Sequence, residues 1–405
     1  MGISIKKRYL EQAIYEDAIA KGKMAFISGP RQCGKTTLAQ ELLKKQGEEK
    51  NYFTWDDDEF RKKWIKNPKQ IFNELQFPQT GKPLVVFDEL HKHRVWKRSL
   101  KGLYDIYKEK IDILVTGSAR LDIYRKSGDS LQGRYFPYRL HPFTLGETDH
   151  IKPPPKKDWF EHSMKIFPLE DLLKLGGFPE PLFGGIQTEA QRWQRLRRER
   201  LVREDLRDLK FVRDLQAIEN LILFLQDGAA QSLSFQSLAE DLQISFSTIK
   251  DWIKILESLY FCFLLRPYTK RIRRSLKKEP KLYLYDWSVI KDRGAKIENL
   301  VAAHLLKSCH VWTDLAFGYF ELFYIRDKEK REVDFLIVKD DRPFALIEVK
   351  SNQQEISKSL IHFANLFQPS FTFQVVTKKE YEKRVLTTHP EIWIVEIEHF
   401  LSALN

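Results

Sequence analysis

The chain has 405 residues, of which 42% are hydrophobic and 31% are charged. At roughly 150 residues per domain this length predicts two or three domains, and the composition is that of a soluble globular protein, which excludes disordered, collagen-like and disulfide-scaffold chains. Lys and Arg number 68 against 56 Asp and Glu, so the formal net charge is +12. This excess favours a polyanionic partner such as nucleic acid or a nucleotide, although basic proteins without such a partner are common.

The chain has three cysteines, none in a CxxC spacing, which excludes a disulfide framework. This cysteine content indicates a reducing compartment, and we expect the protein in the cytoplasm. The sequence has no run of about 18 apolar residues, so we expect neither a transmembrane helix nor a membrane partner. The N-terminal residues also lack the apolar run of a signal peptide.

The first third of the chain alternates short apolar strands with amphipathic helices. We predict buried strands at 24–28, 83–87 and 111–115 and a helix at 37–45. Strands separated by helical lengths imply βαβ crossovers and a parallel sheet. This part of the chain therefore predicts an α/β domain over residues 1–150.

A glycine-bearing loop between the first strand and its helix fits the pattern GxxxxGK[ST]. Glycines let backbone N–H groups wrap around phosphate oxygens, and the helix N-terminus adds partial positive charge. Lys35 can reach the β and γ phosphates, and the Thr36 hydroxyl can bind Mg²⁺, so the loop predicts a site for ATP with Mg²⁺. The expected nucleotide-binding residues are Gly29, Pro30, Arg31, Gln32, Cys33, Gly34, Lys35, Thr36 and Thr37.

A carboxylate pair ends the second predicted strand, at the edge where ligands bind in open parallel sheets. We expect Asp88 to hold Mg²⁺ and Glu89 to polarise the attacking water as the catalytic base. After the third strand, we take the hydroxyl of Ser118 as a group that hydrogen-bonds this water or the γ-phosphate. A polar turn without a catalytic role is the alternative for Ser118.

Several segments together carry a family resemblance. The N-terminal third resembles an AAA+-related P-loop ATPase family, common in bacteria and archaea, through GPRQCGKTT, VVFDE, LVTGSA and GDSLQGRYFPYRLHPFTLGE. Further matches follow at LGGFPEP, REDL, GAKIENLVAAHLL, REVDFLIV and FALIEVKS. This resemblance implies an ATPase core with a P-loop NTPase parallel sheet, a helical or winged-helix middle, and a C-terminal α/β fold similar to PD-(D/E)xK nucleases.

In such ATPases an arginine often completes the site of a neighbouring subunit, because a guanidinium spreads its charge over the γ-phosphate oxygens. Arg134 is our first candidate for this arginine and Arg120 is our second. We therefore expect a homo-oligomer, or a partner protein that supplies the arginine. A structural arginine that pairs with a carboxylate is the alternative.

Three adjacent prolines, Pro153 to Pro155, mark the end of the first domain. The chain is then mainly helical in pattern, and strands return from residue 281. We therefore expect a linker, a helical region and a winged helix over 151–275, and a nuclease-like domain over 276–405.

The middle region contains a helix-turn-helix pattern. We expect Ser234 to cap a short first helix and Ser247 to cap the second, whose apolar residues recur at helical spacing. A β-like run over 260–266 is what a wing requires.

A segment rich in Lys and Arg, residues 266–281, follows this helix-turn-helix pattern. Basic charge beside a recognition-like helix is typical of nucleic-acid binding, so we expect DNA as a partner. A solvated face, or a module that serves as a lid, is the alternative. The expected DNA-contacting residues are Lys270, Arg271, Arg273, Arg274 and Lys277.

The C-terminal domain contains the pattern D…ExK at Asp334, Glu348 and Lys350. Period-two geometry puts Glu348 and Lys350 on one face of a strand, and a hairpin or neighbouring strand can bring Asp334 beside them. These carboxylates would then bind a second Mg²⁺ or a Mn²⁺, with Glu298 of a preceding helix as a further ligand. The alternative is an inactive fold in which a lysine pairs with the carboxylates, so nuclease activity is left open.

Together these features predict a Mg²⁺-dependent ATPase that couples ATP to DNA binding or processing. The alternative is a nucleotide-switched scaffold or regulator that cuts nothing. Stimulation of ATP hydrolysis by DNA would separate the two.

Overall fold

The computed structural model describes residues 7–117, 131–206, 214–269, 279–351, 355–377, 383–388 and 390–405. The chain forms two compact units. The N-terminal unit comprises Gly2–Pro142 and Thr148–Ile151, and the C-terminal unit comprises Phe143–Glu147 and Lys152–Asn405.

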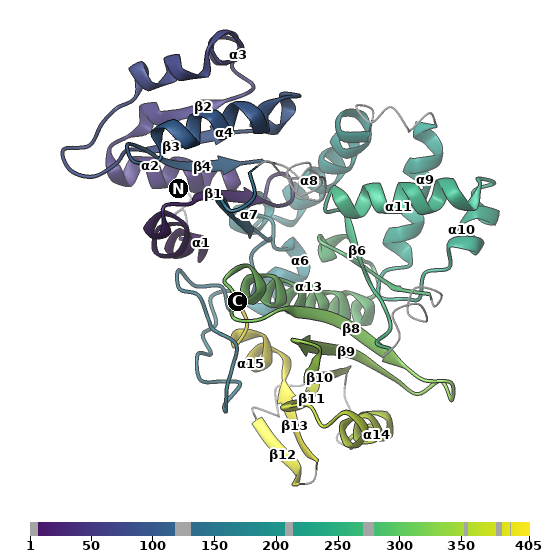
Figure 1. The fold of residues 1–405 in the computed structure, drawn as a ribbon. Coiled ribbons are helices and arrows are strands. Elements are labelled where there is room, and N and C mark those ends of the chain that lie inside the picture. Colours follow the sequence, from purple (N-terminus) through teal and green to yellow (C-terminus); the bar gives the residue numbers. More distant parts are fainter. Residues whose placement is uncertain are drawn as a thin grey trace. The chain divides into compact units, whose positions relative to one another are not determined.

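The N-terminal unit contains a five-stranded parallel sheet in the order β2-β3-β4-β1-β5 (Figure 1). Every residue of β1 and β3 is buried, as expected of central strands that are covered on both faces. The predicted parallel α/β sheet is therefore confirmed, and the three predicted strands lie within one residue of β1, β3 and β4. The strands are β1 (Met24–Ser28), β2 (Tyr52–Thr54), β3 (Leu84–Asp88), β4 (Asp112–Thr116) and β5 (Tyr135–Arg139).

Aromatic side chains of α3 pack against the central strand β3 and hold it in place. Phe60 and Trp64 of α3 pack against Phe87 of β3, with ring centroids 6.3 and 5.1 Å apart, inside a larger apolar core. This packing holds the end of β3, and therefore the carboxylates that follow it, in a defined place. The α-helices described in this unit are α1 (Leu10–Ala13), α2 (Lys35–Gln46), α3 (Asp58–Lys66) and α4 (Trp96–Tyr107).

The first half of the C-terminal unit is mainly helical, as its sequence pattern predicts. Its strands β6 (Cys262–Leu265) and β7 (Lys281–Leu284) pair antiparallel, so the basic segment lies between two paired strands. The described helices are α6 (Leu169–Leu175), α7 (Pro179–Gly184), α8 (Gln187–Arg200), α9 (Leu215–Asp227), α10 (Phe235–Asp241) and α11 (Phe246–Ser258).

The helix pair α10 and α11 has the predicted helix-turn-helix connectivity, with one correction at its second cap. Ser234 caps α10, because its side chain accepts a hydrogen bond from the N–H of Ser237. Ser245, rather than the predicted Ser247, caps α11 by accepting from the N–H of Thr248. Both serines are good N-cap residues, and only the position of Ser245 leaves Phe246 and Ser247 inside the first helical turn.

The second half of the C-terminal unit is built on a mixed six-stranded sheet in the order β12-β13-β11-β10-β9-β8. The 22-residue helix α13 packs on β8 and β9, and α14 packs on β9 and β10 (Figure 1). In the described part of the chain no helix is both long and apolar enough to cross a membrane. The elements are α13 (Arg293–Asp314), β8 (Phe320–Arg326), β9 (Glu332–Lys339), β10 (Arg342–Lys350), α14 (Lys358–Phe367), β11 (Phe371–Val376), β12 (Lys383–Thr388), β13 (Glu391–Glu396) and α15 (Ile397–Ser402).

The middle and C-terminal regions, predicted to divide near residue 276, form one compact unit. Backbone hydrogen bonds join the two sides of that predicted boundary: Tyr268 N–H donates to Tyr324 and Tyr324 N–H donates to Arg266, at 2.7 and 3.2 Å. The side chain of Asn299 on α13 also exchanges hydrogen bonds with the backbone of Leu284 on β7. Strand β7 is therefore anchored to the C-terminal helix as well as to β6.

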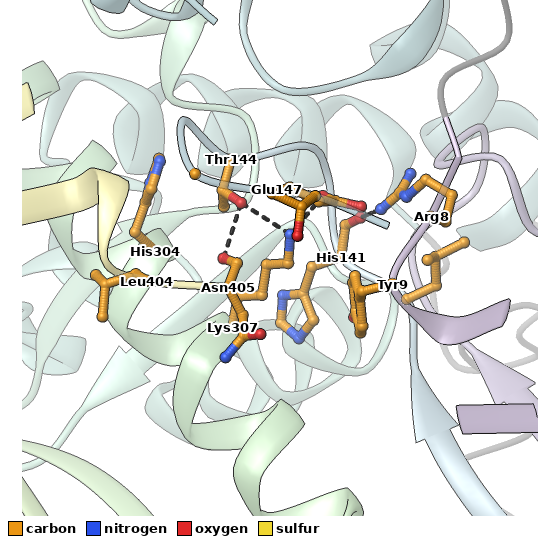
Figure 2. A network of polar contacts seen from close by, with 12 residues as sticks. Arg8, Tyr9, His141, Thr144, Glu147, His304, Lys307, Leu404 and Asn405 are labelled. Carbon is orange, nitrogen blue, oxygen red and sulfur yellow. Dashed lines mark hydrogen bonds and ion pairs between the residues drawn. The ribbon is translucent and has the colours of Figure 1, made fainter. Parts of the chain in front are cut away.

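A buried polar network inside the C-terminal unit fixes the segment 143–147 to α13 (Figure 2). The ammonium group of Lys307 is wholly buried, donates to Thr144 Oγ1 at 2.8 Å and pairs with Glu147. Thr144 in turn donates to the backbone carbonyl of Asn405. His304 accepts a hydrogen bond from the N–H of Leu145 at 2.9 Å. Burial of charge requires this kind of pairing, so the network makes the position of the segment specific.

Candidate functional site

The loop between β1 and α2 has a backbone that only glycine can adopt at two positions. Gly29 and Gly34 have φ angles of 152° and 97°. A Cβ atom at Gly29 would lie 2.2 Å from the carbonyl oxygen of Leu140, a separation that no side chain permits. The predicted glycines therefore let the loop pass close to Leu140 and turn into the N-terminus of α2.

Lys35, at the start of α2, is buried and bends back into the loop. Its ammonium group donates to the carbonyl oxygens of Gly29 and Pro30, at 2.9 and 2.7 Å. These contacts place a positive charge inside the loop, next to the helix N-terminus, whose own partial charge is also positive. This arrangement is suited to the phosphate groups of a nucleotide.

The other predicted loop residues fall into two groups. Cys33 is wholly buried and its Sγ lies 3.5 Å from the carbonyl oxygen of Leu140, which gives it a packing position. Gln32 has a left-handed φ of 62° and shapes the turn. Arg31 and Thr37 are exposed at the loop and at the first turn of α2.

The C-terminal ends of four neighbouring strands lie side by side. Asp88 of β3 is opposite Thr116 of β4 on one side and opposite Thr54 of β2 on the other, and Thr116 is opposite Ile27 of β1. The parallel register thus brings the predicted carboxylate to the same edge of the sheet as the loop that follows β1.

Asp88 is buried and accepts three hydroxyl hydrogen bonds. Thr36 Oγ1 and Tyr52 Oη donate to its Oδ2 at 2.9 and 2.5 Å, and Thr116 Oγ1 donates to its Oδ1 at 2.6 Å. The Thr36 hydroxyl and the Asp88 carboxylate, the two predicted Mg²⁺ ligands, are therefore adjacent. Mg²⁺ is commonly held by one or two protein oxygens and several waters, and this pair fits such an ion.

Glu89 has a left-handed backbone, with φ 56°, and its N–H donates to the carbonyl oxygen of Thr116 at 2.9 Å. Burial raises the pKa of its carboxyl above the usual value, an effect that Lys92 and Lys35 oppose and Asp88 reinforces. Its Oε2 lies 3.7 Å from the ammonium of Lys92 and 3.6 Å from Nε2 of His91. A carboxylate with a raised pKa is a stronger proton acceptor, as a catalytic base requires.

Of the two arginines predicted to complete a neighbouring site, the structure describes only Arg134. Arg134 donates to both carboxylate oxygens of Asp105 on α4, at 2.7 and 3.1 Å, so it has an ion-pair partner within its own unit. Its role in a neighbouring subunit stays a prediction. Arg120 and Ser118 lie outside the described residues.

Tyr52 belongs to this site and was not predicted. It is the first residue of the three-residue strand β2, and its hydroxyl reaches Asp88 Oδ2. Three residues are too few to show a strand periodicity, so the sequence carries no signal that Tyr52 faces Asp88. Thr116 lies in LVTGSA, one of the motifs of the family resemblance, but its contact with Asp88 requires the β3–β4 register.

A second polar cluster lies in the C-terminal unit, around Lys281 of β7. The lysine Nζ is 3.2 Å from Glu298 on α13, and 2.7 and 3.4 Å from Glu332 and Asp334 on β9. Tyr283 Oη donates to the same oxygen of Glu298 at 2.8 Å. Burial and the nearby Asp334 raise the pKa of Glu298 to about 7, although Lys281 and the Tyr283 hydroxyl act against this rise.

Glu348 and Lys350 share one face of β10, as predicted, and lie 2.7 Å apart. Asp334 is brought beside them by the antiparallel pairing of β9 with β10, and its Oδ2 accepts from the N–H of Val349 at 2.9 Å. Burial raises the pKa of Glu348, and the contact with Lys350 partly offsets this rise. The four residues of the predicted constellation therefore do lie in one region of the fold.

The observed donor set does not fit a divalent ion. Within the described part of the chain, no group of three or more His, Cys, Asp or Glu residues is arranged to hold a metal. Lys281 stands among Glu298, Glu332 and Asp334, and Lys350 pairs with Glu348. Glu298 and Asp334, two of the expected carboxylate ligands, are thus already in contact with the cation of Lys281.

The predicted DNA-contacting residues, Lys270 to Lys277, lie outside the described residues. The structure does remove one member of the basic segment from the surface, because the side chain of Lys281 is 7% exposed. The remaining basic residues of the segment lie between β6 and β7 in the sequence. Strand β6 packs against α11 of the helix-turn-helix pair.

Comparison with known proteins supports the N-terminal assignment. Residues 21–148 match the family model of an AAA domain. The matched residues contain the loop, Asp88 and Glu89, so the match supports an AAA-related P-loop fold for the N-terminal unit. Residues 167–292 and 293–399 match two domains of unknown function, DUF8612 and DUF4143.

Two relatives extend the similarity beyond the AAA domain. An uncharacterised protein of Haemophilus influenzae is 23% identical over 96% of this chain and 97% of its own length. An uncharacterised protein of Methanocaldococcus jannaschii is 25% identical over 88% of this chain and 81% of its own. A solved structure, AMPPCP-bound DnaA from Aquifex aeolicus, aligns over 61% of this chain and 85% of that chain, at 15% identity and a TM-score of 0.27.

Proposed function

We propose that this protein binds ATP with Mg²⁺, hydrolyses it, and uses the nucleotide state to control binding to DNA. The observation that carries the first part is the convergence of Lys35, Thr36, Asp88 and Glu89 at one edge of the parallel sheet. Three of these side chains come from a loop–helix junction and the end of a strand, both within the residues that match the AAA domain family. The fourth, Glu89, follows Asp88 directly.

Each residue has a distinct role in the proposed reaction. The backbone of the loop and the Lys35 ammonium hold the β and γ phosphates. Thr36 and Asp88 hold Mg²⁺, which neutralises charge on the phosphate oxygens. Glu89 accepts a proton from the attacking water, and Tyr52 and Thr116 orient the Asp88 carboxylate through their hydroxyl hydrogen bonds.

An arginine from a neighbouring copy of the chain completes the proposed site. Arg134 and Arg120 remain the candidates, and an exchange of partner from Asp105 to a γ-phosphate would be required of Arg134. This part of the proposal predicts that ATP turnover per chain rises with protein concentration.

The experiment that tests the ATP site compares Lys35→Ala and Glu89→Gln with the parent protein. Lys35→Ala removes the side-chain cation from the phosphates, and ATP affinity should fall by roughly ten- to a hundredfold. Glu89→Gln removes the base but keeps the phosphate contacts, so it should bind ATP normally and turn over roughly 10² to 10⁴ times more slowly. Binding is measured with a fluorescent ATP analogue, and turnover by phosphate release.

The matched control is Lys45→Ala. Lys45 lies on the same helix, but its partner is Glu11 and it is exposed, so both quantities should stay at the parent value. Equal turnover in Glu89→Gln and the parent protein would refute the role of Glu89. Unchanged ATP affinity in Lys35→Ala would refute the site itself.

The DNA part of the proposal rests on charge and connectivity. The segment between β6 and β7 is rich in Lys and Arg, and β6 packs on α11, the second helix of the helix-turn-helix pair. A basic segment that joins two strands next to such a helix is suited to the phosphate backbone of DNA. The proposal includes no cleavage step, because lysines contact the carboxylates that a divalent ion would need.

A second candidate function is a nucleotide-switched regulator of another protein. The helix-turn-helix pair would then serve as a packing element, as such modules do in other nucleotide-driven proteins, and the basic segment would be a solvated surface. Exposed Leu223 and Phe224 on α9 are the observation that favours a protein partner. DNA would leave ATP turnover unchanged in that case.

A further inference from the structure

Lys281 is the best-buried cation of the carboxylate cluster in the C-terminal unit. Its Nζ lies within 3.4 Å of Glu298, Glu332 and Asp334, which come from α13 and β9. Its side chain is 7% exposed, while those three carboxylates are 21%, 29% and 16% exposed. The lysine is therefore more deeply buried than the three carboxylates, which lie between it and solvent.

The strand that carries Lys281 aims it inward. Lys281 and Tyr283 are two residues apart on β7, so their side chains share one face of the strand. Both reach the same oxygen of Glu298. The backbone of β7 is fixed by its pairing with β6 and by the hydrogen bonds between Leu284 and the side chain of Asn299. The position of the ammonium group is thus set by the fold and does not depend on a flexible surface side chain.

The chemistry of an ammonium group matches this environment. It carries three donors, and three carboxylates lie at 2.7 to 3.4 Å from it. A divalent ion would need the same oxygens at about 2.0 to 2.6 Å. The lysine Nζ and a divalent ion cannot occupy this space together, because both are cations and both require the same acceptors.

We propose that the Lys281 ammonium is the built-in cation of this module: it occupies Glu298 and Asp334, two of the carboxylates that the nuclease resemblance assigns to a divalent metal, so that the module works without metal. The proposal goes beyond ATP hydrolysis and DNA binding, neither of which depends on the identity of this cation. It also gives the last residue of the basic segment a role inside the fold, whereas the sequence had placed it among the surface charges.

The test measures Mn²⁺ binding by the full-length protein, with electron paramagnetic resonance as the readout. All proteins carry Asp88→Asn, which removes the ATP-site carboxylate from the measurement. With Lys281 present, Mn²⁺ binding should not change when Asp334→Asn is added. Lys281→Met should create a site at least tenfold tighter than the background, and Asp334→Asn should abolish it. The matched control is Lys291→Met, which removes an exposed lysine that pairs with Asp227 alone and should create no site.

A second measurement covers the case in which Lys281→Met folds poorly. Loss of the lysine leaves three carboxylates without their shared cation, so the melting temperature of the variant should fall. An ion that binds only the folded state raises the melting temperature, so millimolar Mn²⁺ should raise it for Lys281→Met and leave it unchanged for the protein with Lys281.

Two results would overturn the proposal. One is Mn²⁺ binding that depends on Asp334 while Lys281 is present. The other is failure of Lys281→Met to gain either Mn²⁺ binding or stabilisation by Mn²⁺, which would mean that the lysine is not what excludes the ion. Both outcomes are independent of ATP turnover, so a failure here leaves the proposed function standing.

Discussion

Asp88 shows how a single side chain depends on residues that are far apart in the sequence. Its three hydroxyl donors come from α2, β2 and β4. A carboxylate that accepts several hydrogen bonds is held in one orientation, which a metal ligand requires. The sequence predicted Asp88 and Thr36 because both belong to short contiguous motifs. Tyr52 was missed because its contribution exists only once β2 and β3 are paired.

Lys281 illustrates a different limit of prediction from the sequence. Read along the sequence it is one cation among many in a basic segment, and its neighbours in the chain suggest solvent. Its three partners lie 17, 51 and 53 residues further along the chain. Only the strand register of β7, which puts Lys281 on the same face as the buried Tyr283, determines that it points inward.

His304 gives a prediction about pH at the residue scale. Its Nε2 accepts from the N–H of Leu145 and its Nδ1 donates to the carbonyl oxygen of Leu300, an arrangement that requires the neutral ring. Burial, reinforced by the nearby Lys307 and Lys152, lowers the pKa of His304 to about 3, although the hydrogen bond to Leu300 acts in the opposite direction. In the unfolded chain the same ring titrates near its ordinary pKa of about 6.5.

The direction in which pH changes the free energy of unfolding follows from these two pKa values. Above pH 6.5 neither state is protonated and the contribution of His304 to stability is complete. As the pH falls from 6.5 towards 3 the unfolded state takes up a proton that the folded state does not, so the folded state loses stability by roughly 1.4 kcal/mol per pH unit. Urea unfolding of the parent protein and of His304→Gln should therefore differ less at pH 5 than at pH 7, by about 2 kcal/mol.

The control for this measurement is His150→Gln, because His150 is 79% exposed. Its difference from the parent protein should be the same at both pH values. A parent-minus-His304→Gln difference that does not change between pH 7 and pH 5 would mean that the ring is protonated in the folded protein.

At the scale of elements, strong local patterns predicted well and weak ones did not. Strands β1, β3 and β4 are continuous apolar runs, and the structure has each within one residue of its predicted range. Strand β5 (Tyr135–Arg139) was not predicted, because it contains Pro137 and is only partly buried. It lies at the edge of the sheet beside β1, where a proline is tolerated because one side of the strand has no partner to bond.

The helix-turn-helix pair leads to a prediction about the basic segment that follows it in the sequence. Replacement of Arg271, Arg273 and Arg274 by Gln should weaken DNA binding and flatten its dependence on salt, because each lost phosphate contact lowers the slope of log K against log salt by roughly one unit. Binding is measured by fluorescence anisotropy with a labelled duplex over a series of salt concentrations.

A variant with the same loss of charge separates local contact from net charge. Arg192, Arg195 and Arg200 are exposed on α8, and their replacement by Gln should change DNA affinity much less and leave the slope near that of the parent. Equal effects of the two triple variants would show that DNA responds to the overall charge of the protein. If neither triple variant changes DNA binding, the basic segment does not take part in it.

At the scale of the whole molecule, the sequence predicted three domains and the structure has two compact units. The prolines near residue 153 and the change in pattern near 276 are both local signals. The contacts that join the helical region to residues after the predicted boundary are not local: they include the hydrogen bond from the Trp287 indole to Leu172 and the ion pair of Arg293, at the start of α13, with Glu170. Composition and periodicity do not reveal such contacts, so the domain boundary near residue 276 stays a prediction; the two matched domains of unknown function meet at residues 292 and 293.

The central claim is that ATP hydrolysis by the AAA domain serves DNA binding, and turnover of MgATP with and without duplex DNA tests it most directly. At saturating ATP and low salt, duplex DNA should raise the turnover of the parent protein several-fold. It should leave the turnover of the Arg271, Arg273 and Arg274 triple variant at its DNA-free value, and Glu89→Gln should stay inactive in both conditions. An equal rate for the parent protein with and without DNA would contradict the account and favour a nucleotide-switched regulator of another protein.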